Sequence, residues 1–317
     1  RPPRSTLDRS SAASDVYKRQ IGTTTLDAIT TGDNNVAVGY DALTANTTGE
    51  KNIAIGSGAL DGPDTESNNL AIGYEAMSAS IAGGEYNVAV GNSSLKALTS
   101  GDKNTGIGYN ALTGVTTGSW NTAVGYEAGK AMTTGADNTA FGLSAGAAIT
   151  TGSRNIAIGG VALDNVDTEN DNLAIGYAAL GGAIAGGEFN VAIGNYTLDA
   201  LTTGDKNIAL GHTAMSGMTT GGTNIAIGYG ALDVETNGWD NIAIGNDALG
   251  GASMSGGYGN ATVGSYSLDA VTSGDYNSSF GYSSLSTVTT GNYNVGLGGY
   301  SGSVTTGSYN TSVGYSS

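Results

Sequence analysis

The sequence contains no cysteine, only three prolines and no long apolar run. The absence of cysteine excludes a disulfide framework and any thiolate metal site. Apolar stretches of only a few residues cannot form a transmembrane helix. Basic residues are scarce, with 11 Lys and Arg against 27 Asp and Glu and a net charge of −16. This balance argues against nucleic-acid binding and against attraction to anionic lipid.

Catalytic side chains are also scarce, because the chain has a single histidine, His212. One histidine without any cysteine leaves almost no acid–base pair or activated nucleophile. The sequence therefore predicts a protein that is not an enzyme. Glycine is abundant, at 54 residues, but does not fall at every third position, which excludes collagen. A hydrophobic content of 39% is too high for a disordered linker.

A five-residue phrase fills the chain: asparagine, two small or branched residues, a bulky apolar residue and glycine. It begins with Asn35–Gly39 and ends with Asn310–Gly314. The closing glycines between these copies lie at 56, 73, 91, 108, 125, 142, 159, 176, 194, 211, 228, 245, 264, 281 and 298. Twelve of the sixteen intervals are 17 residues, and the others are 16, 18, 18 and 19. So short a period indicates one backbone unit stacked many times.

Each repeat can be read by position, with the closing glycine as position 0. Position −1 is Val, Ile, Leu or Phe in every copy, and position −2 is Ala in twelve. This alternation predicts a strand with its large side chains on one face. The small face at −2 must then lie against a closely packed neighbour.

The pattern continues beyond the glycine, with a small residue at +3, Leu or Met at +4 and an apolar residue near +7. Thr-Thr-Gly or Thr-Ser-Gly follows, as at residues 116–118. We therefore expect a strand, a glycine corner, a second short strand and a Thr-Gly-x-x-Asn corner in each coil. The predicted fold class is all-β, a parallel β-solenoid (β-roll) of about 17 coils with a 17-residue period and a length on the order of 80 Å.

The first twenty residues lack the repeat and carry five of the eleven basic residues. They include SAASDVYKRQ, which resembles translated sequencing-adaptor read-through. We interpret residues 1–20 as an artefact, the alternative being a disordered tail, and residues 21–317 as a single solenoid domain truncated at both ends. The longer coils add their extra residues at one corner, beside Gly83, Gly186 and Gly256, as a solenoid tolerates.

The phrase Gly-x-x-Asn-(Val/Ile)-Ala-(Val/Ile)-Gly-x-x-Ala resembles the head repeat of YadA-like trimeric autotransporter adhesins; residues 204–214 carry it with Leu at the second branched position. The Thr-Thr-Gly arrays, as in residues 116–126, are similar to those of phage tail fibres. The resemblance covers residues 21–317. It implies a left-handed β-roll, three chains side by side and an adhesive role outside the cell, on a cell surface or virion. The coil here is longer than the adhesin coil and could bury its own core, so monomer and homotrimer both stay open; the alanine face favours the homotrimer.

Two sets of side chains are candidate sites. Tyrosine occupies position +1 in eight copies. One interpretation is an aromatic row that binds sugar rings by stacking; the other is a ladder of tyrosines at the solvent-exposed edge or in a subunit contact. These are Tyr40, Tyr74, Tyr109, Tyr126, Tyr177, Tyr229, Tyr282 and Tyr315, and His212 takes the same position. Acidic residues gather at one corner twice, where they predict a solvated loop or a weak Ca²⁺ site without EF-hand spacing. These are Asp61, Asp64 and Glu66, and Asp164, Asp167 and Glu169.

The leading functional hypothesis is a structural extracellular fibre or adhesin shaft, with other copies of the chain and a host-surface glycan or matrix as partners. The alternative is a filament subunit stacked end to end through its open strand edges. A glycan-processing enzyme would need clustered carboxylates, for which the acidic corner residues are the only candidates. No cofactor is expected beyond the weak Ca²⁺ candidates.

Overall fold

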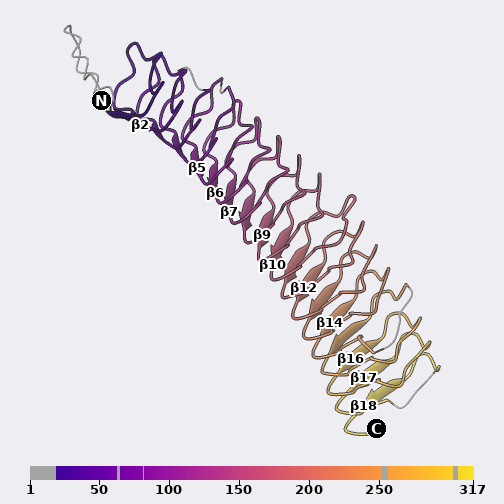
Figure 1. The fold of residues 1–317 in the computed structure, drawn as a ribbon. Helices are drawn as coiled ribbons and strands as arrows, with labels where there is room; N and C mark the ends of the chain where they lie inside the picture. Colours follow the sequence, from indigo (N-terminus) through magenta and orange to yellow (C-terminus); the bar gives the residue numbers. More distant parts are fainter. Residues whose placement is uncertain (1–18, 63–64, 81, 252–255, 303–305) are drawn as a thin grey trace.

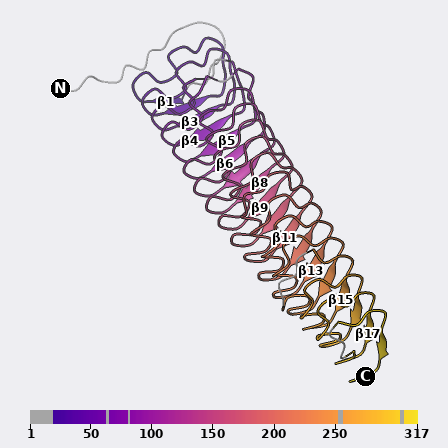
Figure 2. The ribbon, with the colours of Figure 1, turned by 90° about the vertical axis from the view of Figure 1, so that its right-hand side faces the viewer.

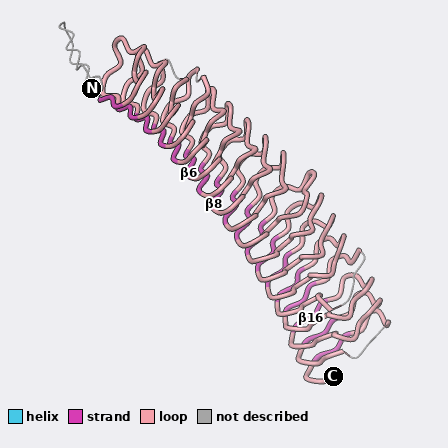
Figure 3. Tube along the Cα trace, in the orientation of Figure 1, coloured by secondary structure: helices cyan, strands magenta, loops and turns pink. Residues whose placement is uncertain are grey.

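A computed structural model describes residues 19–62, 65–80, 82–251, 256–302 and 306–317. The described chain winds into a gently curved rod, with the N-terminal coils at one end and the C-terminal coils at the other (Figures 1 and 2). One short strand per coil lies on the same side of the rod, and turns make up the rest of the coil (Figure 3).

Eighteen strands of three residues each form the fold. They are β1 Arg19–Ile21, β2 Val36–Val38, β3 Ile53–Ile55, β4 Leu70–Ile72, β5 Val88–Val90, β6 Thr105–Ile107, β7 Thr122–Val124, β8 Thr139–Phe141, β9 Ile156–Ile158, β10 Leu173–Ile175, β11 Val191–Ile193, β12 Ile208–Leu210, β13 Ile225–Ile227, β14 Ile242–Ile244, β15 Ala261–Val263, β16 Ser278–Phe280, β17 Val295–Leu297 and β18 Thr311–Val313.

All strands pair in parallel and in register along one sheet. Ile53, Ala54 and Ile55 of β3 lie beside Leu70, Ala71 and Ile72 of β4, and the same positions meet at every later step. The predicted all-β parallel solenoid of about 17 coils and a 17-residue period is confirmed. Strand β1 includes Arg19 and Gln20, two residues before the predicted start of the repeat.

The small face of the strand points into the coil itself. The alanines at −2, such as Ala54 and Ala157, are fully buried. Where glycine replaces them, a Cβ would meet the preceding coil: at Gly296 the nearest atoms belong to Ser284 and Leu285, at +3 and +4. The expectation that the alanine face needs another chain is therefore wrong, because the Leu row of the same chain covers it.

The predicted second strand is also wrong. Residues +1 to +6 form turns, in which positions +2 and +4 have positive φ, as in Asp41 (51°) and Leu43 (54°). Position −5 is left-handed too, as in Lys51 (57°). The closing glycine has positive φ as well, as in Gly39 (139°), so each coil has four positive-φ positions, three of them mostly occupied by residues other than glycine. Coil-to-coil hydrogen bonds nevertheless continue through these turns, for example from the Leu43 N–H to the Ala59 carbonyl at 3.0 Å.

A buried asparagine ladder runs along the interior at position −4. From Asn35 to Asn294, the side-chain Oδ1 accepts the backbone N–H of the next asparagine, and Nδ2 donates to a carbonyl of the next coil. The Asn121 Oδ1 accepts from the Asn138 N–H at 3.0 Å, and its Nδ2 donates to the Gly135 carbonyl at 2.8 Å. Both side-chain atoms are satisfied although Asn121 has no exposed surface.

Buried glutamates support the lengthened coils. In the three coils longer than 17 residues, the glycine at −8 has positive φ: Gly83 (116°), Gly186 (114°) and Gly256 (84°). Each N–H donates to a glutamate of the preceding coil, at 2.9 Å to Glu66, 2.8 Å to Glu169 and 3.3 Å to Glu235. These carboxylates lie inside the coil, at no more than 5% exposure. The extra residues are thus accommodated without interrupting the asparagine ladder.

Candidate interaction surface

The outward face of strands β2 to β18 is a mostly apolar stripe along the rod. It consists of positions −3 and −1 of β2 to β18, which hold Val, Ile, Leu, Phe, Thr, Ser and Ala and no charged residue. Its large side chains are partly exposed, for example Ile53 at 37%, Ile158 at 36% and Phe280 at 59%. We call these residues the strand-face stripe.

The stripe is larger than the apolar patches of ordinary monomers. Two outward positions on each of seventeen strands, at on the order of 40 Å² of exposed apolar area each, give on the order of 1,000 Å². The largest patch on a soluble monomer is about 300–600 Å². A stable protein–protein interface buries about 800 Å² on each partner. The stripe is therefore large enough for a stable interface.

The predicted tyrosine row lies beside the stripe, on the corner that follows each strand. All eight tyrosines are exposed, between 48% and 77%. Tyr109 and Tyr126 stack face to face, with ring centroids 5.2 Å apart, and His212 stacks on Tyr229 in the same way. Stacked rings cover each other's faces, which is the surface a sugar ring would need. These pairs therefore favour the ladder interpretation over sugar stacking.

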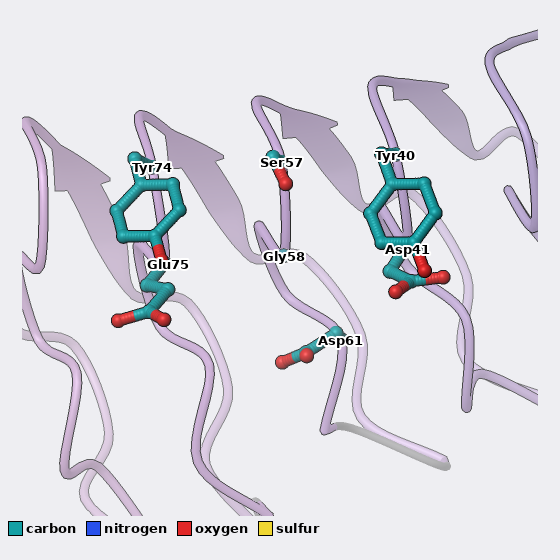
Figure 4. A pocket seen from close by; sticks show the side chains of 7 residues that line it. All are labelled: Tyr40, Asp41, Ser57, Gly58, Asp61, Tyr74 and Glu75. Carbon is teal, nitrogen blue, oxygen red and sulfur yellow. The ribbon is translucent and has the colours of Figure 1, made fainter.

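Tyr40 and Tyr74 differ from the stacked pairs, because the coil between them carries the small residues Ser57 and Gly58. A shallow depression of about 210 Å³ opens there (Figure 4). Its lining also includes Asp41, Asp61 and Glu75.

Carboxylates give this depression a negative character. Burial raises the pKa of Asp61, and the charges of Asp41 and Glu75 raise it further. Lys96 bonds to Glu75 at 2.5 Å and lowers the pKa of that carboxyl. Glu75 in turn accepts a hydrogen bond from the Tyr74 phenol, which raises the pKa of Tyr74. The depression thus combines aromatic side chains with a local excess of negative charge.

The acidic corner residues that the structure describes do not converge on one site. Glu66 and Glu169 turn inward, and their carboxylates accept backbone N–H groups, including Thr65 at 3.0 Å and Thr168 at 2.9 Å. Asp167 is exposed, Asp164 is half-buried, and Asp64 lies outside the described residues. Across the described ranges, no group of three or more His, Cys, Asp or Glu side chains is placed to hold a metal ion.

Aspartates at position +5 share one electrostatic environment, which the sequence pattern did not indicate. Burial raises the pKa of Asp61, Asp164, Asp199, Asp233 and Asp269. The effect is largest at Asp233, where burial and the charge of Asp247 in the next coil raise the pKa to about 6. The Asp233 Oδ1 is buried and accepts no hydrogen bond.

Position −5 forms a second exposed row, on the corner that precedes each strand, which the sequence analysis did not single out. Its side chains interact from coil to coil. Arg154 forms a two-pronged ion pair with Asp171, at 2.6 and 2.7 Å, and the Lys103 ammonium lies 3.9 Å from the Trp120 ring centroid. The 17-residue spacing of these charged and aromatic residues in the sequence could have predicted that they form a row. The strand-face stripe therefore lies between two rows of large side chains.

Comparison with protein-family models, curated proteins and solved structures finds no match to the chain. Over the described residues, the structure has no helix with the length and hydropathy needed to span a membrane.

Proposed function

We propose that the chain is a rigid shaft of an extracellular fibre or adhesin, in which three copies lie side by side through the strand-face stripe. The observation that carries the proposal is the stripe itself: a mostly apolar surface without charged residues that continues from β2 to β18. Exposed apolar area of this extent is unfavourable in water, and burying it favours association. The homotrimer is the assembly implied by the resemblance to YadA-like head repeats.

The rod architecture supports a mechanical role. Each coil contacts only its neighbours, and its stability comes from the stacking of equivalent positions. A rod of this kind can hold a distal domain away from a cell or virion surface. If sister chains cover the stripe, the corner rows and the depression between Tyr40 and Tyr74 are the surfaces left for a host glycan or matrix protein.

Charge placed on the stripe tests the assembly. Ile158 and Ile227 lie on the stripe, in β9 and β13. The double variant Ile158→Glu/Ile227→Glu would bring carboxylates together in an apolar contact, which costs several kcal/mol if they stay ionised. We expect its solution mass to fall to that of one chain.

The control is Leu143→Glu/Tyr229→Glu, which places the same two charges at exposed apolar positions of the +1 corner, off the stripe. The control is expected to keep the mass of the unaltered chain. A stripe variant that keeps that mass, or a control that dissociates equally, would contradict association through the strand face.

A further inference from the structure

Three tyrosines at the C-terminal end of the −5 row stack face to face. The Tyr276 and Tyr293 rings lie 5.2 Å apart at 9°, and Tyr293 and Tyr309 lie 5.2 Å apart at 10°. Their exposures are 51%, 47% and 79%. We call these residues the tyrosine stack.

The backbone fixes this arrangement. Each member has a left-handed φ between 55° and 61°, and its N–H donates to a carbonyl of the preceding coil. The Tyr276 N–H donates to the Tyr258 carbonyl at 2.8 Å, and the Tyr309 N–H donates to the Asn292 carbonyl at 2.9 Å. The rings of successive coils therefore lie nearly parallel and face to face along the stack.

The opposite corner provides a contrast within the same coils. Tyr266, Tyr282, Tyr300 and Tyr315 meet edge to face, at interplanar angles of 75°, 64° and 85°. In that arrangement the edge of one ring meets the face of the next, so the two ring carbons beside the hydroxyl groups are not aligned. Two sets of exposed tyrosines of similar number thus differ in ring geometry.

We propose that the tyrosine stack is a site of oxidative cross-linking, in which a haem peroxidase and hydrogen peroxide join tyrosines of adjacent coils as dityrosine. Each of two phenols loses one electron and one proton to the oxidant. The two radicals form a carbon–carbon bond between the ring positions beside their hydroxyl groups. The hydrogen on each bonded carbon then moves to the oxygen and restores the phenol. The two hydrogen atoms removed overall reduce one peroxide to two waters.

The composition of the chain favours this chemistry at the stack. Without cysteine, oxidation cannot join the coils by disulfides, and the exposed tyrosine phenols are groups that a peroxidase can couple. The methionines at 77, 132, 215 and 218 are fully buried and protected from oxidant. A link from Tyr276 to Tyr293 closes a short loop, and short-loop cross-links restrict the unfolded chain as disulfides do. Oxidation would therefore fasten the C-terminal coils to one another.

The test treats the dilute full-length chain with a haem peroxidase and hydrogen peroxide. Dityrosine fluorescence measures the yield, and peptide mass mapping locates links by the loss of two hydrogen atoms. The stack variant is Tyr276→Phe/Tyr293→Phe/Tyr309→Phe, and the control is Tyr266→Phe/Tyr282→Phe/Tyr300→Phe. Both variants keep every ring and lose only hydroxyl groups, and circular dichroism verifies that each folds.

We expect links within one chain that join Tyr276 to Tyr293 or Tyr293 to Tyr309. The intrachain yield should fall by more than half in the stack variant and change little in the control. The proposal is overturned if no dityrosine forms, if the links map to other tyrosines, or if both variants lose yield equally.

Discussion

At the scale of single residues, the asparagines at position −4 hold each coil to the next from inside the rod. Asn121 illustrates the arrangement, because it bonds to two neighbouring coils while fully buried. A buried polar ladder of this kind is stable only when every member is satisfied. Asparagine opens every repeat in the sequence, where the Thr-Gly-x-x-Asn pattern predicts that it lies at a corner. The residue is instead a polar part of the core.

Replacement of Asn121 by Ala should therefore be costly. It would leave the Gly135 carbonyl and the Asn138 N–H buried without their partner. Each unsatisfied buried group costs about 1–3 kcal/mol, so we expect the two to lower the free energy of unfolding by about 2–6 kcal/mol. Chemical denaturation measures it, with Asn165→Ala as the control because Asn165 is exposed. Equal effects of the two substitutions would argue against a structural ladder.

Asp233 should make stability depend on pH. Its pKa in the folded chain is about 6, above the ordinary value of 3.8. Because the pKa of Asp233 is higher in the folded than in the unfolded chain, protonation of Asp233 stabilises the folded chain. This contribution to the free energy of unfolding is complete below pH 3.8 and is lost as pH rises through about 6.

Asp233→Asn removes the charge and should stabilise the chain at pH 7 by about 1–2 kcal/mol, a value reduced from the full shift because the carboxyl is partly exposed. The gain should vanish near pH 4, where the native aspartate is protonated. Thermal unfolding of the two proteins across this range measures the difference. A gain that is the same at both pH values would show that titration of Asp233 is not its cause.

At the scale of the coil, the strand was predictable and the turn was not. Alternation of large and small residues at −3, −2 and −1 located every repeat strand. The same alternation at +3 and +4 predicted a second strand, although Asp41 and Leu43 adopt left-handed φ there. Periodicity reports which side chains are buried and not the backbone path that buries them. Left-handed leucine is unfavourable in isolation, and burial and inter-coil hydrogen bonds at each coil compensate.

Glu169 is expected to stabilise the coil that follows it. Its carboxylate accepts the N–H groups of Gly186, Asp167 and Thr168. In Glu169→Ala these donors lose their acceptor, so we expect faster amide exchange at the Gly186 corner and a loss of about 1–3 kcal/mol in unfolding free energy. Glu50→Ala changes an exposed glutamate and serves as the control. If amide hydrogen exchange at Gly186 is the same in Glu169→Ala as in the unaltered chain, Glu169 does not stabilise this corner.

At the scale of the whole molecule, equivalent positions form continuous surfaces. The sequence predicted the tyrosine row at +1, because identical positions stack in a solenoid, and the structure places all eight in that row. It did not predict which strand face is exposed. Ala54 and Ile53 point to opposite faces of the strand, and the alternation is the same whichever face is buried. The path of the turn determines that Ala54 packs against the Leu row while Ile53 is exposed. The acidic corner, which the sequence predicts as a solvated loop or a weak Ca²⁺ site, differs for a related reason: Glu66 and Glu169 turn inward and accept N–H groups of the lengthened coils.

The solution mass of the unaltered chain, measured by light scattering together with particle length from X-ray scattering, distinguishes side-by-side assembly from the alternatives. We expect about three chain masses in a particle as long as one rod, on the order of 80 Å. Several chain masses in a proportionally longer particle would indicate end-to-end filaments. One chain mass at that length would contradict assembly through the strand-face stripe.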